Sequence, residues 1–387
     1  MHLSPAELGG RLRFADVRLV IGTRPEAIKL APVAHALRDS GLPPTLVFTD
    51  QHFALDPAEF GLEFYPAVRL GCPGEEDPNR HVQAVIAAML PLLTPAPDLL
   101  VVQGDTSSAL GAALAASLAG VAVAHVEAGL RTHDPRLPWP EEEYRTSIDA
   151  RADLLFAPTE TAVANLRAEG VGGEVHMTGN TGIDALKATQ ALLAAQPLVT
   201  EGLPRILVTC HRRESWGEGL KSIATALIEI ARDGAARIEL VLHPNAHVAA
   251  MMRQSLDSIR GISLIAPCTQ IELVRRMREA DLMLSDSGGI QEEATALGTP
   301  LLVLREKTER PEAIASGNAR LVGTSPDRIV AEVRRLLENP SERLAMARPA
   351  FPFGDGHAGP RIAEVIHRFL MVNRPQLMSR NNAKNAG

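Results

Sequence analysis

The sequence predicts an α/β protein built from two doubly wound, Rossmann-like domains, and two observations carry this prediction. Short apolar runs alternate with longer amphipathic runs along the chain, which is the pattern of βαβ units in mostly parallel sheets. The alternation stops across residues 188–204, which are first rich in alanine and then read LVTEGLP, and it restarts afterwards. With 387 residues the chain has room for two domains, which we place at residues 1–190 and 200–359.

In the first half, the predicted strands are runs of Val, Leu, Ile and Ala that end in polar or glycine-containing turns. They are residues 18–21, 45–49, 99–103, 121–125, 154–157 and 175–178. The predicted helices between them are residues 27–39, 107–119 and 161–169. Strands that alternate with helices in this way favour a parallel sheet that is covered on both faces.

The second half repeats the pattern. Its predicted strands are residues 206–209, 239–242, 263–265, 282–285, 301–304 and 319–323. Its predicted helices include residues 220–232, 271–280 and 290–297, and a last helix covers residues 360–372. The apolar pattern alone leaves open whether this last helix packs on the second domain or on the first.

Composition excludes several classes of protein. Hydrophobic residues make up 45% and charged residues 22%, and 39 basic against 46 acidic residues give a net charge of −7, so we expect no nucleic-acid partner. No apolar run reaches the roughly 20 residues of a membrane span, and the first residues lack the layout of a signal peptide. Three scattered cysteines without metal-site spacing favour a cytoplasmic protein that has no structural metal.

Chemistry-bearing residues follow the predicted strands of the first half. Arg24 and Lys29 come after a glycine turn at a helix start, which suits an anionic ligand. Asp105, Glu127 and Glu141 follow later strands and together place three carboxylates at one edge of a cleft. Considered alone, Asp105 is explained as the cap of the next helix, and Glu141 is explained as one of the acidic residues that are favoured in the first turn of a helix. Taken together, crowded carboxylates supply an acid and a base near neutral pH.

In the second half, His211 follows the strand RILVT and is a candidate anion contact. Ser287, Gly288 and Gly289 lie between a buried strand and a helix, where two glycines leave backbone N–H groups open to a diphosphate.

Two further residues complete this candidate site. Glu293 lies one turn into that helix and suits a ribose diol, and Arg310 follows the next strand toward the same cleft. Because ligands bind outside the carboxyl ends of parallel strands, the pattern indicates a nucleotide-sugar site between two domains that face each other across a cleft.

Eight motifs stand in register between about residue 17 and about residue 369: GTRPEAIK, GDTSS, HVEAGLRT, WPEE, HRRES, SDSGGIQEE, TERPEA and FGDG. In these motifs the chain resembles the UDP-N-acetylglucosamine 2-epimerases of the non-hydrolysing, bacterial type. This resemblance implies the glycosyltransferase-B architecture, in which a helix within residues 360–387 crosses back to the first domain. It also implies a homodimer.

The resemblance implies a mechanism without a nicotinamide cofactor. A base removes the C2 proton as UDP leaves, and UDP then adds back to the 2-acetamidoglucal while a proton arrives on the other face. Asp105, Glu127 and Glu141 resemble the acid and base carboxylates of this family. His211 and Arg24 resemble groups that stabilise the departing diphosphate, with Lys29 close by.

The remaining correspondences concern the nucleotide. The resemblance assigns the phosphates to Ser287, Gly288 and Gly289, the ribose to Glu293 and the diphosphate region to Arg310.

Bacterial members of this family often bind a second UDP-N-acetylglucosamine as an activator. The chain keeps the corresponding residues Gln51, His52, Arg212 and His243. It departs from the family in the acidic segment of residues 73–78, where extra carboxylates disfavour a second anionic ligand. We therefore hypothesise that activation by substrate is weak or absent.

Several functions stay open at this point. Tyr144, which replaces the usual asparagine, and the altered residues 72–79 leave room for another UDP-2-acetamido sugar, such as a diacetamido uronic acid, or for hydrolysis to free N-acetylmannosamine. A retaining glycosyltransferase and a non-catalytic nucleotide-sugar sensor are the alternatives from other classes. All three carboxylates are present, which argues against both.

Overall fold

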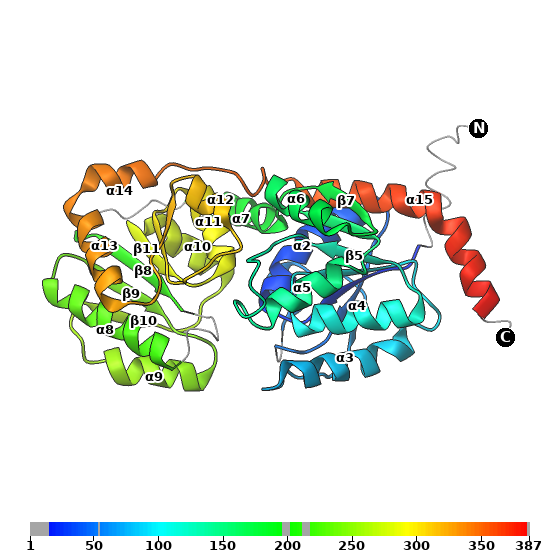
Figure 1. The fold of residues 1–387 in the computed structure, drawn as a ribbon, viewed down its shortest axis with the longest axis horizontal. Coiled ribbons are helices and arrows are strands. Elements are labelled where there is room, and N and C mark those ends of the chain that lie inside the picture. The colour runs from blue at the N-terminus through cyan, green and yellow to red at the C-terminus, as the bar shows by residue number, and fades with distance from the viewer. Residues whose placement is uncertain (1–14, 53–54, 196–201, 211–216, 385–387) are drawn as a thin grey trace. The chain divides into compact units, whose positions relative to one another are not determined.

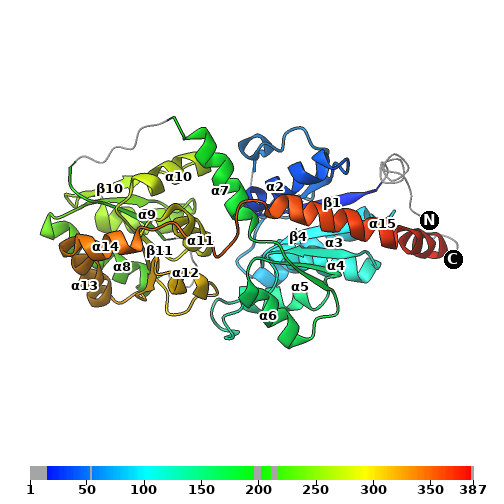
Figure 2. The ribbon, with the colours of Figure 1, turned by 90° about the horizontal axis from the view of Figure 1, so that it is seen from above.

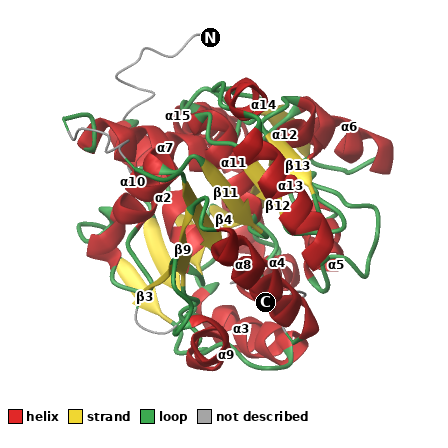
Figure 3. Cartoon of the chain, turned by 90° about the vertical axis from the view of Figure 1, so that its left-hand side faces the viewer, coloured by secondary structure: helices red, strands yellow, loops and turns green. Residues whose placement is uncertain are grey.

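The computed structural model describes residues 15–52, 55–195, 202–210 and 217–384, and the chain divides into two compact units. Unit 1 comprises residues 1–185 together with 354–387, and unit 2 comprises residues 186–353. Each unit has one parallel sheet, and helices lie on the outside of the strands (Figures 1 and 3). This confirms the predicted α/β class with two doubly wound sheets.

Unit 1 has a seven-stranded sheet in the order β3-β2-β1-β4-β5-β6-β7, and all neighbouring strands are parallel. Its strands are β1 (Val17–Ile21), β2 (Thr45–Phe48), β3 (Ala67–Arg69), β4 (Leu99–Gln103), β5 (Val123–Val126), β6 (Leu154–Ala157) and β7 (Glu174–Met177). Six of them match predicted strands. The pattern missed β3, because all three of its residues are exposed and leave no apolar signal.

Helices cover both faces of this sheet because successive residues of a strand point to opposite sides. Leu19 and Ile21 of β1 belong to a core with the first and last helices of the unit, whereas Val20 belongs to a second core with the helices between them. The helical segments of the unit are α2 (Arg24–Asp39), η1 (Pro57–Phe60), α3 (Pro78–Leu92), α4 (Ser107–Ala119), α5 (Glu141–Asp149), α6 (Glu160–Glu169) and α15 (Ala358–Lys384).

The last helix, α15, lies along α2 in unit 1 (Figures 1 and 2). Ile362, Ile366 and Leu370 of α15 are buried in the same core as Leu30 of α2. Asp184 fixes the start of α15, since its carboxylate accepts hydrogen bonds from the backbone N–H groups of the first two residues of the helix, at 3.1 and 2.8 Å. Asp184 belongs to α7 (Thr181–Leu192), which runs across the boundary between the units and into the segment where the strand pattern stops.

Unit 2 has a six-stranded parallel sheet in the order β10-β9-β8-β11-β12-β13. Its strands are β8 (Arg205–Thr209), β9 (Arg237–Val241), β10 (Ile262–Ile265), β11 (Leu282–Ser285), β12 (Leu301–Val303) and β13 (Ala319–Leu321). Its helices are α8 (Glu218–Asp233), α9 (Ala246–Leu256), α10 (Gln270–Glu279), α11 (Gly288–Leu297), α12 (Pro311–Ala315), α13 (Pro326–Glu338) and α14 (Pro340–Met346). Ile206 and Val208 of β8 pack in a core with α8 and α13.

The strand orders place one topological switch point in each sheet, between β1 and β4 in unit 1 and between β8 and β11 in unit 2. Open parallel sheets bind ligands outside the carboxyl ends of strands at such points. In the described part of the chain, no helix is long and apolar enough to cross a membrane.

Candidate functional site

Glu26 joins the two turns that flank the switch point of unit 1. Its Oε2 accepts hydrogen bonds from the backbone N–H groups of Gly22 and Thr23, at 2.8 and 2.5 Å, and its Oε1 accepts one from the Thr106 hydroxyl at 2.7 Å. The side chain is buried, and this burial raises its pKa to about 7 although the hydrogen bonds act in the opposite direction. A buried carboxyl group thus connects the start of α2 to the turn that carries Asp105.

Glu127 lies in the same part of the unit, just after β5, with a backbone φ of 72°. Its Oε2 accepts hydrogen bonds from the Lys29 ammonium at 2.5 Å and from the Gln103 amide at 2.6 Å. Both side chains of the ion pair are largely buried, with 11% of Lys29 and 6% of Glu127 exposed. The structure therefore brings together two predicted site residues that are 98 positions apart in the sequence.

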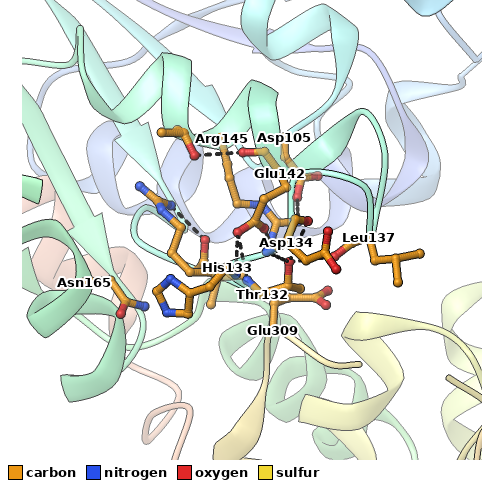
Figure 4. A network of polar contacts seen from close by, with 12 residues as sticks. Asp105, Thr132, His133, Asp134, Leu137, Glu142, Arg145, Asn165 and Glu309 are labelled. Atoms are coloured by element: carbon orange, nitrogen blue, oxygen red, sulfur yellow. Dashed lines mark hydrogen bonds and ion pairs between the residues drawn. The ribbon is translucent and has the colours of Figure 1, made fainter. Parts of the chain in front are cut away.

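Asp105 pairs with Arg145 of α5, a residue that the prediction did not include (Figure 4). The Arg145 side chain is only 2% exposed, and its Nη1 also contacts Glu142 Oε2 at 3.1 Å. Glu142 in turn accepts hydrogen bonds from the backbone N–H groups of Thr132 and His133, at 2.9 and 3.0 Å. Asp105 keeps 27% of its side chain exposed, more than Arg145 or Glu142, so solvent reaches this carboxylate.

The third predicted carboxylate, Glu141, is the first residue of α5 and lies one helical turn before Arg145. The three carboxylates therefore belong to the β4–α4 turn, the segment after β5 and the start of α5. Carboxylates placed beside cationic and amide donors at the edge of a sheet are suited to proton transfer.

Arg24, the first residue of α2, contacts the loop after β2, which carries the second-site candidates Gln51 and His52. The backbone N–H of Arg24 donates to His52 Nδ1 at 3.3 Å, and its guanidinium pairs with Glu59 at 2.8 Å. Gln51 Oε1 accepts a hydrogen bond from the Ser108 hydroxyl at 2.7 Å, at the start of α4. Gln51 and His52 are thus held at the switch-point edge of unit 1.

In unit 2, the turn between β11 and α11 contains the predicted glycines. The backbone N–H of Ser287 donates to Ser285 Oγ at 3.1 Å, which fixes the turn. A Cβ atom on Gly288 would lie 2.4 Å from Nη1 of Arg310, whereas one on Gly289 would meet no atom within 4 Å. Gly288 is therefore needed for the packing of Arg310, and the surface around Gly289 is open.

Arg310 itself is buried and bound by two carboxylates. Its Nε donates to Glu292 Oε1 at 2.6 Å, and its Nη1 pairs with Glu309. Glu293, the predicted ribose contact, accepts a hydrogen bond from the Gln270 amide at 2.9 Å. These contacts fix both residues beside the glycine turn, and direct contact of Arg310 with phosphate stays a prediction.

Three predicted residues remain, and all of them belong to unit 2. His243 follows β9, and its Nδ1 accepts a hydrogen bond from the backbone N–H of Asn245 at 2.9 Å. His211 and Arg212 lie outside the described residues.

The contrast between the two glycines gives a stability prediction. We expect Gly288→Ala to lower the free energy of unfolding by about 1–3 kcal/mol, the range for overpacking, because the new methyl group displaces Arg310 from Glu292. Gly289→Ala is the matched control, and we expect it to be neutral or to stabilise by up to about 1 kcal/mol because alanine favours a helix. Urea unfolding of the two variants measures the difference, and equal losses would contradict the packing role of Gly288.

Three residues that organise this edge were not predicted from the sequence. Glu26 has a signal, since Thr23 followed three residues later by Glu26 is a capping-box pattern. Arg145 stands in WPEEEYR, one turn after the acidic helix start. His125 interrupts the apolar run VAVAHV, and a polar group in a buried strand needs a partner. The clusters are built from acids, amides and bases, and among the described residues none offers three metal-ligating side chains together.

Comparison with known proteins identifies the family of the chain. Residues 35–367 match the family described as UDP-N-acetylglucosamine 2-epimerase. The chain is 41% identical over 373 residues to the UDP-N-acetylglucosamine 2-epimerase of Salmonella typhimurium, which covers 91% of this chain and 98% of that relative.

Solved structures agree with this match. The UDP-GlcNAc 2-epimerase of Neisseria meningitidis bound to UDP-GlcNAc has a TM-score of 0.85 and 35% identity, covering 91% of this chain and 100% of that one. The enzyme of Methanocaldococcus jannaschii in complex with UDP-GlcNAc and UDP has a TM-score of 0.79 and 31% identity, covering 91% and 99%. The chain therefore belongs to the UDP-N-acetylglucosamine 2-epimerase family.

Proposed function

We propose that this protein interconverts UDP-N-acetylglucosamine and UDP-N-acetylmannosamine by inverting C2 of the sugar. The observation that carries the proposal is the arrangement at the switch point of unit 1, where Glu127 is bound by Lys29 and Asp105 by Arg145. Inverting a carbon that bears hydrogen needs a group that removes the proton and another that returns it to the opposite face. The names and bound ligands of the related proteins support the choice of sugar.

In the proposed reaction, a carboxylate of the set Asp105, Glu127 and Glu141 removes the proton from C2. The C1–O bond breaks with its electron pair on UDP, and a C1–C2 double bond forms, which gives 2-acetamidoglucal and UDP. The return step adds the UDP oxygen to C1 and a proton to the other face of C2. Two differently placed carboxylates are needed because the two faces of C2 point in opposite directions.

The cationic residues serve the departing diphosphate in this proposal. Arg24 stands at the start of α2, where the helix dipole also favours an anion. In unit 2, the N-terminus of α11 with Ser287, Gly288 and Gly289 offers backbone N–H groups to the UDP phosphates, and Glu293 accepts the ribose hydroxyls. Stabilising the leaving group lowers the barrier because negative charge develops on UDP as the bond breaks.

We further propose that the product serves surface polysaccharide synthesis and that the protein acts as a cytoplasmic homodimer. Light scattering tests the homodimer. The related proteins are named as epimerases, which favours this activity over glycosyl transfer and over sensing without turnover.

Proton NMR of the purified protein with UDP-N-acetylglucosamine tests the reaction. We expect a new anomeric signal of UDP-N-acetylmannosamine that grows to a constant ratio. Accumulation of free N-acetylmannosamine and UDP would instead identify a hydrolysing enzyme. Dependence on an acceptor would identify a transferase, and binding without turnover would identify a sensor.

Asp105→Asn provides a mechanistic prediction for the same assay. We expect turnover to fall by about 10²–10⁴-fold, the usual contribution of an acid or base, while UDP binds with little change. Titration calorimetry with UDP measures the second quantity. A loss of UDP binding would assign Asp105 a structural role rather than proton transfer.

A further inference from the structure

A buried cluster behind the carboxylates connects the three segments that carry them. His125 of β5 and Asp149 of α5 are both fully buried, and His125 Nδ1 lies 2.6 Å from Asp149 Oδ1. The other ring nitrogen, Nε2, lies 2.8 Å from the backbone carbonyl oxygen of Gly104, the residue before Asp105. The imidazole ring therefore bridges α5 and the β4–α4 turn.

Asp149 also reaches the segment after β5. Its Oδ2 accepts a hydrogen bond from the backbone N–H of Gly129 at 3.1 Å and pairs with the Arg131 guanidinium at 2.8 Å. Gly129 comes two residues after Glu127, and both have positive φ values, 84° and 72°. A single buried carboxylate thus holds this irregular segment and, through His125, the turn of Asp105.

The His125 ring is held on both sides. Its Nε2 lies beside the Gly104 carbonyl oxygen, which can only accept a hydrogen bond, so Nε2 is the donor there. Its Nδ1 lies beside the Asp149 carboxylate. Burial by itself would raise the pKa of Asp149, but the contacts with His125 and Arg131 outweigh this effect and lower it.

Stability alone does not explain charges at this depth. Hydrophobic side chains of similar volume often stabilise a core as well as a buried ion pair does, because of the cost of removing charges from water. The ionic arrangement also fixes the orientation of the turns, because His125 holds the carbonyl group of Gly104 and Asp149 holds the N–H group of Gly129. An acid or base group that is displaced by about 1 Å can lose about 100-fold in rate.

We propose that His125 and Asp149 are positioning residues for the epimerase reaction: they hold the turns of Asp105 and Glu127 in a fixed relation to α5, which carries Glu141. This proposal rests on the proposed function, because the three carboxylates are its acid and base groups. His125 and Asp149 act through the backbone and do not touch the substrate.

The first test is spectroscopic and needs no substrate. With ¹⁵N-labelled histidine, we expect Nε2 of His125 to carry a hydrogen that exchanges slowly with solvent, with the signal assigned by its absence in His125→Phe. In Asp149→Asn we expect this hydrogen to exchange faster, because the ring loses the carboxylate that holds it. Exchange in the wild type as fast as at the partly exposed His176 would overturn the proposal.

The second test separates positioning from a merely structural role. We expect Asp149→Asn to lower kcat by about 100-fold per folded molecule and to change KM by less than about twofold, the pattern of a lost transition-state interaction with ground-state binding retained. We expect His125→Gln, which keeps an N–H group that can reach the Gly104 carbonyl, to retain more activity than His125→Phe. An unchanged kcat in folded Asp149→Asn, or equal losses in the two His125 variants, would overturn the proposal.

His176→Phe is the matched control. His176 of β7 also lies near a carboxylate, Glu174, at 3.3 Å, but this pair is partly exposed. We expect the kcat of this variant to equal that of the wild type. Absence of epimerisation by the wild-type protein would refute the proposed function, whereas the contact of His125 with the turn of Asp105 would still be decided by the nitrogen spectra.

Discussion

Arg145→Met is expected to destabilise the protein by about 3 kcal/mol, the lower end of the range for breaking a buried ion pair. The substitution removes the cation that lies between Asp105 and Glu142 and leaves both carboxylates near each other. The loss stays at the lower end because Glu142 keeps the backbone N–H groups of Thr132 and His133 as donors. We also expect turnover to fall, because Asp105 loses the partner that orients it.

Urea unfolding and kcat measure these two effects, and Arg151→Met is the control. Arg151 follows the same helix, but it is exposed and donates to Ser147 in the preceding turn. We expect this control to change stability by less than about 0.5 kcal/mol, as for most surface substitutions. Equal stability of Arg145→Met and the wild type would show that the buried contacts of Arg145 contribute nothing net to folding.

Glu26→Gln is expected to change how stability depends on pH. The pKa of Glu26 rises from the usual 4.5 to about 7 on folding, because the carboxyl group is buried. The folded protein therefore binds a proton at Glu26 more tightly than the unfolded chain does. The stability that Glu26 contributes is therefore fully present below pH 4.5, decreases as the pH rises to about 7, and is absent above that pH.

Between pH values below 4.5 and above about 7, the contribution of Glu26 to stability changes by about 3 kcal/mol, which is the free energy that corresponds to the rise in its pKa. Glutamine carries no charge, so we expect the stability of Glu26→Gln relative to the wild type to increase by most of this amount, about 2.5 kcal/mol, from pH 5 to pH 8. Urea unfolding at pH 5, 6, 7 and 8 measures it, with the exposed Glu63→Gln as the control. Parallel pH curves for Glu26→Gln and the wild type would contradict the burial of a titrating carboxyl group.

Much of the fold can be predicted because both faces of each sheet are covered. Strands such as β1, β4 and β8 are short apolar runs that end in polar turns, so their positions follow from the sequence. The exposed β3 has no such signal. The alanine-rich end of α7 does not show that the helix runs across the unit boundary, because alanine favours helices but leaves no apolar stripe.

The sequence motifs propose the residues of the candidate site, but they do not predict the contacts among these residues. The motifs identify Lys29 and Glu127, yet their ion pair depends on the pairing of strands far apart in the sequence. The partner of Asp105 is Arg145, which follows from the packing of α5 and not from a local pattern. Arg310 is an apparent phosphate ligand in the sequence, whereas the structure shows that two carboxylates bind it, which the sequence cannot reveal.

The central claim is that C2 loses its proton to a protein carboxylate while UDP departs. The most direct test is to run the reaction in D₂O and observe C2 by NMR. We predict deuterium at C2 of UDP-N-acetylmannosamine, and also at C2 of UDP-N-acetylglucosamine recovered after equilibrium, because the proton exchanges with solvent. Epimer that retains its original hydrogen at C2 would contradict proton removal by an exchanging carboxylate.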